Sequence, residues 1–342
     1  MNSLKLFFCV PEKDIAMSEY RFQSGIKGRG LTFTRRAMYF SRALLGIPIF
    51  VRDFPAALGI RRTKSSKAIQ FMNDICNSTN GSGLEMIDSF VKICKRSITK
   101  KFDSDVVPTL KSKTKFSEDL INRVVGELGS DGFSIIRSGL PGEQTALLRD
   151  RLDEIPGSES TGNQYRKFVN WLSEGVKPRL FLDQNMVGIA VDESGIDIDG
   201  LTLIARRYLG SKPHLLGPQC WYTKPTNNPT PLDLEEAAMA FHCDSDFFGF
   251  FKVFLLCTDV SEENGPFAFL RGSHKGKRHV QGRLSDEQLS IVHGERLLAT
   301  GKAGDLFIVA TKGWHKATPP TAGHRLMVQW LFSTGYFGSA TS

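Results

Sequence analysis

Four side chains in the second half of this 342-residue chain are of the types that bind a metal ion and an anion. His242 and Asp244 lie two residues apart in a run of strand-forming residues, so in an extended strand their side chains point to the same face. His315 follows the apolar run 306–310, and Arg325 lies ten residues later on another strand-like run. The two imidazoles and the carboxylate can therefore converge on one metal ion.

Two histidines and one carboxylate are the protein ligands of the facial triad in non-haem Fe(II) oxygenases, which leaves coordination positions open. We therefore predict that His242, Asp244 and His315 are the metal ligands and the catalytic residues of an iron site. Asp246 is a rival for Asp244 because it lies on the same face of the expected strand, but the spacing from His242 favours Asp244. Asp246 is then a candidate for a group that orients a ligand.

The other histidines are weaker candidates for ligands. His274 lies in a Gly-Ser-His turn and is expected to be solvated, and the same interpretation applies to His279 and His293. His324 competes with Arg325 for the inward position, and a different strand pairing would turn His324 toward the pocket. Arginine suits a carboxylate because its planar fork donates two hydrogen bonds at once.

Two segments carry a family resemblance, FHCDSDFFGFFKVFLLCTDVSEENGPFAFLRGSHK and GDLFIVATKGWHKATPPTAGHR. From about residue 116 to residue 337 the chain resembles the phytanoyl-CoA dioxygenase family of Fe(II)- and 2-oxoglutarate-dependent oxygenases. The resemblance implies that His242, Asp244 and His315 hold Fe(II). It also implies that Arg325 binds the distal carboxylate of the cosubstrate 2-oxoglutarate, with O2 as the second cosubstrate.

Two more residues are candidates for contacts with 2-oxoglutarate. Family members often carry a hydroxyl side chain two residues after the distal histidine, where this chain has Ala317, so either Thr318 substitutes or the contact is absent. Lys252 lies inside an apolar run and needs an anionic partner if it is buried. The cosubstrate carboxylate is one such partner, and a strand-end lysine that reaches water is the alternative.

The sequence predicts an α+β fold with a mainly β core. A helix over 120–128, a strand over 133–136 and a helix from Pro141 onward match the way the resembled family enters its barrel. The resemblance thus implies a double-stranded β-helix, also called a jelly roll or cupin-like barrel, with flanking helices. We place the boundary near residue 115, between an N-terminal region (1–115) of unknown role and a dioxygenase domain (116–342).

Trp221 and Tyr222 end a strand before a proline-rich loop that is expected at the mouth of the site. They are either substrate contacts or core residues. In the strand expected over 251–260, Lys252 and Phe254 share one face, and the alternate residues share the other.

The N-terminal region is basic. Residues 1–120 hold 21 Lys and Arg against 11 Asp and Glu, whereas the whole chain has a net charge of +8. Helices are expected within 34–60, 66–76 and 84–98. The simplest interpretation is a helical appendage with a solvated basic face. The alternatives are docking to an acidic carrier, to a phosphorylated substrate or to an anionic membrane surface, while nucleic-acid binding lacks any supporting motif.

The cysteines and the hydropathy indicate the cellular compartment in which the protein is expected. Six cysteines without a CxxC pair indicate neither a zinc ribbon nor a disulfide scaffold, and they fit reduced thiols in the cytoplasm. No apolar run approaches the roughly 18 residues of a transmembrane segment, and the N-terminus reaches charged residues too soon for a secretory signal.

The predicted function is that of an Fe(II)- and 2-oxoglutarate-dependent dioxygenase. It would hydroxylate an unactivated C–H bond of a small organic or lipid-like substrate and release succinate and CO2. Two alternatives stay open. One is a non-catalytic jelly-roll module that binds or senses a ligand. The other is a zinc hydrolase with the same three ligands, for which Asp246 is the one local candidate for a general base.

Overall fold

The computed structural model describes residues 38–48, 70–71, 74–75, 78–79, 86–91, 93–94, 100–159, 166–175, 177–225, 238–244, 246–247, 249–275, 283–289, 292 and 294–335. The three segments predicted as helices in the N-terminal region are described in part. Their described residues are helical, at 38–48, at 70–71 and 74–75, and at 86–91 and 93–94. The remainder of these predictions lies outside the described residues.

The two helices predicted after residue 115, over 120–128 and from Pro141 onward, are confirmed as α6 and α7. Ser117 caps α6, where its side chain accepts a hydrogen bond from the backbone N–H of Leu120. Gly210 ends α10 in the left-handed conformation, which glycine adopts without a steric cost. The helices are α5 (Lys100–Lys113), α6 (Glu118–Ser130), α7 (Gly142–Asp153), α8 (Phe168–Glu174), α9 (Gln184–Asp192), α10 (Ile198–Leu209) and α12 (Asp286–Leu289), with a 3-10 turn η1 at Ser273–Lys275.

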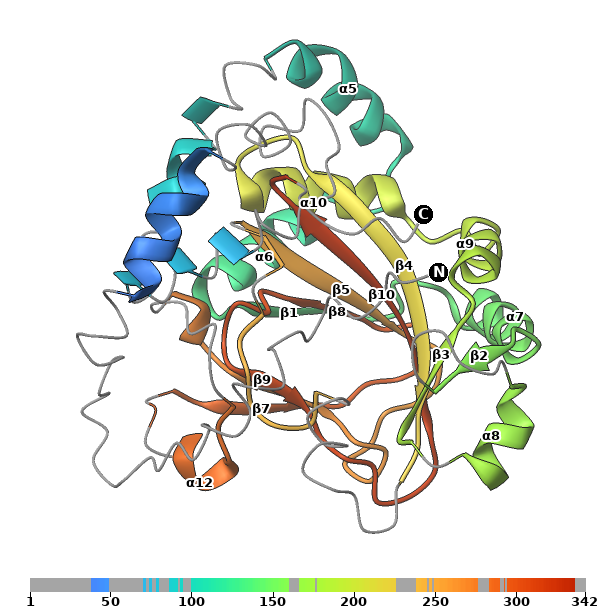
Figure 1. Ribbon diagram of the computed structural model, residues 1–342. Coiled ribbons are helices and arrows are strands. Elements are labelled where there is room, and N and C mark those ends of the chain that lie inside the picture. The colour runs from blue at the N-terminus through green and yellow to red at the C-terminus, as the bar shows by residue number, and fades with distance from the viewer. Residues whose placement is uncertain are drawn as a thin grey trace.

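The strands of the described residues form two antiparallel sheets (Figure 1). The main sheet has the order β1-β8-β5-β10-β4-β3-β2, and the smaller sheet has the order β7-β6-β9. The strands are β1 (Phe133–Ile136), β2 (Gly157–Ser158), β3 (Arg179–Leu182), β4 (His214–Thr223), β5 (Phe250–Leu256), β6 (Phe267–Leu270), β7 (Arg296–Ala299), β8 (Leu306–Val309), β9 (His315–Ala317) and β10 (Arg325–Ser333).

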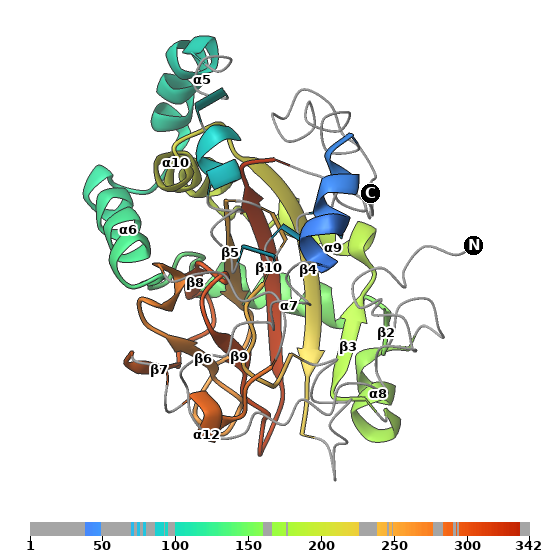
Figure 2. The ribbon, with the colours of Figure 1, turned by 60° about the vertical axis from the view of Figure 1, so that its left-hand side comes forward.

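The main sheet separates two cores. Its outer face packs against α6, α7, α9 and α10 in a large apolar cluster that includes Leu326, Val328 and Val253. Its inner face packs against the smaller sheet, where Phe254 and Met327 meet Phe267 and Phe269 of β6. Figure 2 shows the small sheet below β8, at one side of β10. Two sheets closed over an inner core, with helices outside, confirm the predicted double-stranded β-helix.

The alternation predicted for residues 251–260 is confirmed in β5, although the strand ends at Leu256. Phe254 and Leu256 face the inner core, and Phe251, Val253 and Leu255 face the helices.

The helix α5 lies N-terminal to the predicted boundary at residue 115, and its Val107 and Leu110 pack against the outer core. The division into two domains stays a prediction. Within the described residues, no helix has the length and apolar character needed to cross a membrane.

Candidate metal centre

His242, Asp244 and His315 come together on the inner side of the barrel. One ligand atom from each of the three side chains lies within 4.8 Å of the others. The imidazole Nε2 of His242 is 3.5 Å from Asp244 Oδ1, and that of His315 is 3.4 Å from Asp244 Oδ2. These separations exceed a normal hydrogen bond and suit atoms that share a metal ion. The structure thus assembles the three residues that the sequence singles out.

Backbone pairing holds the two histidines next to each other. His242 and His315 form an isolated antiparallel bridge, in which each N–H donates to the other's carbonyl at 2.9 and 3.0 Å. The backbone N–H of Asp244 donates to the carbonyl of Thr311 at 2.9 Å. The regular strand expected around His242 and Asp244 is therefore wrong, because pairing is confined to Phe241 and His242. The bridge to β9 brings the ligands together instead.

Both imidazoles are held in the tautomer that a metal ion requires. Nδ1 of His242 lies 2.9 Å from the carbonyl oxygen of Ala240, and Nδ1 of His315 lies 2.9 Å from that of Gly313. A carbonyl accepts hydrogen bonds only, so each Nδ1 carries the proton and each Nε2 offers a lone pair. Burial, with the neighbouring imidazole of His315, lowers the pKa of His242. His242 is therefore neutral near pH 7.

A half-buried lysine holds the carboxylate of the centre. Lys252 Nζ donates to Asp244 Oδ2 at 2.8 Å and forms an ion pair of the same length with Asp246. Burial alone would raise the pKa of Asp244, but the charge of Lys252 and the contacts with His315 and His242 together outweigh it and hold this pKa well below its usual value. Burial, with the charge of Asp244 nearby, raises the pKa of Asp246 although Lys252 opposes this. Asp244 therefore stays ionised at neutral pH.

The environment of Lys252 differs from the two that the sequence suggested. Its side chain is 14% exposed, and its ammonium group does not extend to water but pairs with two carboxylates of the chain itself, Asp244 and Asp246. The water-facing alternative is therefore wrong. Its contact with 2-oxoglutarate stays a prediction, whereas its contact with the metal carboxylate is observed.

Arg325 is buried without a partner. Its side chain is 1% exposed, and within the described part of the chain none of its three nitrogens has a hydrogen-bond partner. Burial lowers its pKa to about 10, so the guanidinium stays charged at neutral pH. An unpaired buried cation is costly. The position therefore calls for an anion that the described residues do not supply.

Two further residues lie in line with Arg325 across the sheet. Thr223 of β4 lies directly opposite Arg325 of β10 and also directly opposite Arg179 of β3. Residues opposite each other in an antiparallel sheet point to the same face, so the three side chains form one row on the inner side. The hydroxyl of Thr223 and the Nε of Arg179 are buried and lack a hydrogen-bond partner among the described residues.

The row of Arg325, Thr223 and Arg179 was not identified from the sequence. Burial, with the positive charge of Arg325, lowers the pKa of Arg179 to about 9, and its guanidinium lies 5.4 Å from the centre of the Trp221 ring. The signal in the sequence was an arginine at the start of the apolar run RLFL. Which residues of the three strands lie opposite one another, however, depends on the register between the strands, and the sequence of one strand does not reveal this register.

The remaining predicted residues are placed as follows. Thr318 has a buried hydroxyl without a partner in the described residues, as a contact with a ligand would require. Ala317 is buried beside it, at the end of β9. The expectation that His274 is solvated is wrong, because this side chain is 4% exposed and burial lowers its pKa to about 4. His279 and His293 lie outside the described residues.

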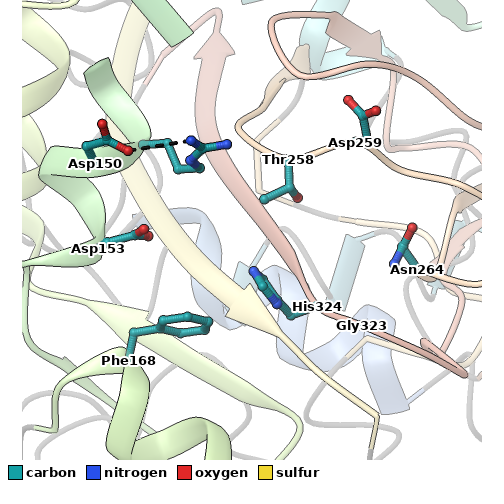
Figure 3. A pocket seen from close by; sticks show the side chains of 9 residues that line it. Asp150, Asp153, Phe168, Thr258, Asp259, Asn264, Gly323 and His324 are labelled. Atoms are coloured by element: carbon teal, nitrogen blue, oxygen red, sulfur yellow. Dashed lines mark hydrogen bonds and ion pairs between the residues drawn. The ribbon is translucent and has the colours of Figure 1, made fainter. Parts of the chain in front are cut away.

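The competition between His324 and Arg325 is settled by the strand pairing. His324 faces the outer side, where its ring lies 4.9 Å from that of Phe168 and 5.9 Å from that of Tyr222. Figure 3 shows His324 and Phe168 on the wall of an open cleft of about 620 Å³. No member of the metal cluster lines this cleft.

Trp221 faces the inner core and Tyr222 the outer core, where its hydroxyl donates to Asp153.

A jelly roll that brings two histidines and a carboxylate together, and that also buries an arginine without a partner among the described residues, has the architecture of enzymes that use Fe(II) and 2-oxoglutarate. Comparison with protein families agrees, because the model for phytanoyl-CoA dioxygenase (PhyH) matches residues 128–327. The chain therefore belongs to the phytanoyl-CoA dioxygenase family, whose members depend on iron and 2-oxoglutarate. A search of curated proteins found no match.

Several solved structures are similar to this chain at low sequence identity. The epimerase SnoN from nogalamycin biosynthesis, in complex with Fe3+, alpha ketoglutarate and nogalamycin RO, is 15% identical, with a TM-score of 0.46 over 63% of this chain and 84% of its own. HygX from Streptomyces hygroscopicus, with nickel and 2-oxoglutarate bound, is 14% identical, with a TM-score of 0.45 over 65% and 87%. EvdO2 from Micromonospora carbonacea is 15% identical, with a TM-score of 0.47 over 66% and 95%.

Proposed function

We propose that this protein is an Fe(II)- and 2-oxoglutarate-dependent dioxygenase that hydroxylates an unactivated C–H bond of a small organic or lipid-like substrate. Succinate and CO2 are the coproducts. His242, Asp244 and His315 hold the iron, and Arg325 holds the distal carboxylate of 2-oxoglutarate.

The observation that carries this proposal is the row of Arg325, Thr223 and the half-buried Arg179 on the inner face of the main sheet. This face borders the inner core, and the ring of His315 on β9 of the smaller sheet stacks on Phe267 of the same core. The two guanidinium groups can only donate hydrogen bonds to a ligand, whereas the hydroxyl can donate or accept one. A carboxylate fits because it accepts several hydrogen bonds and compensates the buried charge. We assign Arg325 the bidentate contact and Thr223 and Arg179 the flanking contacts.

The residues of the metal cluster fit ferrous iron. Two imidazoles with their Nδ1 atoms on backbone carbonyls present Nε2 atoms, Asp244 stays ionised, and one ligand atom from each of the three residues lies within 4.8 Å of the others. When bound, iron activates O2 at the expense of 2-oxoglutarate for the oxidation of a C–H bond. The chain orients the ligands, neutralises the cosubstrate carboxylate and encloses the site between the two sheets. The ring of Phe267 in the inner core stacks on His315 and shields that side of the site from water.

The test begins with metal-free protein under anaerobic conditions. Addition of Fe(II) should give one bound ion per chain, and addition of 2-oxoglutarate should produce a weak visible charge-transfer band. Oxygen should then yield succinate. The variant Asp244→Ala should lose more than about 100-fold in iron affinity and all succinate formation, because a ligand is missing. Asp259→Ala, which removes an exposed carboxylate, is the matched control and should retain both.

The outcomes separate the proposal from its alternatives. Iron and 2-oxoglutarate bound without any succinate, in the presence of candidate substrates, would indicate a binding module. Zinc bound in preference to iron, with ester or amide hydrolysis, would indicate a hydrolase. The substrate itself is to be found by a succinate-coupled screen of small organic and lipid-like molecules. The cytoplasmic location stays a prediction that rests on the cysteine pattern.

A further inference from the structure

The helix at residues 38–48 has one face packed and one face open to solvent. Ala43 is 2% exposed, and Gly46 lies so close to Phe71 that a Cβ on this glycine would be 2.8 Å from the Phe71 ring. The opposite side of the helix exposes five apolar side chains, each between 44% and 78% exposed, together with Ser41. The five apolar side chains are Met38, Phe40, Leu44, Leu45 and Ile47. The helix is drawn in blue at the left-hand edge of Figure 1 and comes to the front in Figure 2.

A second helical piece of the same region repeats this arrangement. Met86, Phe90 and Ile93 follow the spacing i, i+4, i+7, which places them along one side of a helix, and each is more than half exposed. Val91 and Asp88 on the other side are buried. Large apolar side chains that gather on the outside of an otherwise packed chain indicate a surface that is covered by something else.

The charge around these helices indicates what covers them. Residues 34–67 contain eight Lys and Arg and one Asp. Arg42 lies at the flank of the open face, 43% exposed, and is held by Asp74 at 3.4 Å. A helix that exposes Phe, Leu, Ile and Met within a strongly basic segment is typical of segments that lie in the interface of an anionic membrane. A second copy of this chain would bring the same positive charge against itself.

We propose that helix 38–48 docks this protein on an anionic lipid surface. Phe40, Leu44 and Leu45 enter the boundary between headgroups and acyl chains, and the basic residues of the segment neutralise the lipid headgroups. The metal centre and the 2-oxoglutarate row take no part in this contact. The inference therefore holds or fails independently of the proposed function.

The experiment is vesicle co-sedimentation of the full chain. The parent protein should bind vesicles of phosphatidylcholine mixed with phosphatidylserine at least about tenfold more tightly than vesicles of phosphatidylcholine alone, and high salt should weaken this binding. A double variant, Leu44→Glu with Leu45→Glu, should lose at least about tenfold in affinity for the anionic vesicles, because two charges would enter the apolar layer.

The control carries the same charge change elsewhere. Leu147→Glu with Val169→Glu alters two side chains on α7 and α8 that are 59% and 64% exposed, and this variant should bind vesicles like the parent. Circular dichroism and anaerobic iron binding verify the fold of both variants. Equal binding of the Leu44/Leu45 variant and the parent would refute the proposal, as would a parent that ignores anionic vesicles. A parent dimer that dissociates in this variant would assign the face to a second copy instead.

Discussion

The two faces of the main sheet bury polar groups in opposite ways. On the outer face the hydroxyl of Tyr222 donates to Asp153, and the neighbouring residues of β4 and β10 are apolar and packed against helices. On the inner face the guanidinium of Arg325 and the hydroxyl of Thr223 are equally buried, yet lack partners in the described chain. On β4, the hydroxyl of Tyr222 thus has a hydrogen-bond partner within the chain, whereas the hydroxyl of the next residue, Thr223, has none among the described residues.

The difference separates what stabilises the fold from what binds the ligand. A buried polar group without a partner costs free energy, so it is retained where a ligand later supplies the partner. The outer face has no such group on β10, because its residues serve the packing of α6, α7, α9 and α10. Substitutions on the two faces should therefore have opposite effects on stability and on binding.

The largest effect is expected for Arg325→Met. The affinity for 2-oxoglutarate should fall by more than about 100-fold, because the charge-assisted contact with the distal carboxylate is lost. The free energy of unfolding without ligands should rise by about 1 to 4 kcal/mol, because an uncompensated buried charge is removed. Isothermal titration under anaerobic conditions and urea unfolding measure the two quantities.

A matched control is Arg207→Met, which removes a guanidinium that is paired with Glu118 and Asn122. This variant should leave 2-oxoglutarate binding unchanged and should not gain stability. If Arg325→Met binds 2-oxoglutarate as the parent does, the assignment of the cosubstrate site is wrong.

The complementary change on the outer face is Leu326→Ala, one residue away. Leu326 is fully buried among the helices, so truncation should lower the free energy of unfolding by about 2 to 5 kcal/mol through the cavity that it leaves. Affinities for iron and 2-oxoglutarate should stay unchanged at temperatures where the variant is folded. A selective loss of cosubstrate binding with little loss of stability would contradict the division between the faces.

A smaller effect is expected for Lys252→Met. This variant leaves Asp244 and Asp246 buried without their shared cation, so Asp244 binds a proton more readily and is less well oriented. Iron affinity near pH 7 should fall by about 10- to 100-fold. Lys302→Met, which removes the exposed ion pair with Asp259, is the control. Unchanged iron affinity in Lys252→Met would remove the lysine from the metal site.

The smallest effect concerns the pH dependence of stability. Burial lowers the pKa of His274 to about 4 from an ordinary value of 6.5, so the unfolded chain takes up this proton first. The contribution of His274 to stability is therefore complete above pH 6.5 and is lost as the pH falls from there toward 4. In His274→Asn, urea unfolding over this range should show a shallower decline than in the parent. An identical pH profile would show that His274 is not neutral and buried.

Much of the fold and of the site followed from the sequence, for local reasons. Ser117 and Gly210 mark helix ends through their own backbone and side-chain chemistry. The alternation in β5 predicted which residues face the inner core. The error about His274 has a tertiary cause, because whether a turn is solvated depends on what packs over it, here Gly132 and Phe269 from other elements.

The sequence by itself determined which residue types are available for the site: two histidines, one carboxylate and an arginine on strand-forming segments. Only the tertiary structure decided that Lys252 pairs with Asp244, that Arg179 and Thr223 lie in line with Arg325, and that five apolar side chains of helix 38–48 are exposed among the described residues. The physical reason is that side-chain direction repeats locally along a strand or helix. The register between strands and the cover over a helix, in contrast, arise from packing between segments that are distant in the chain.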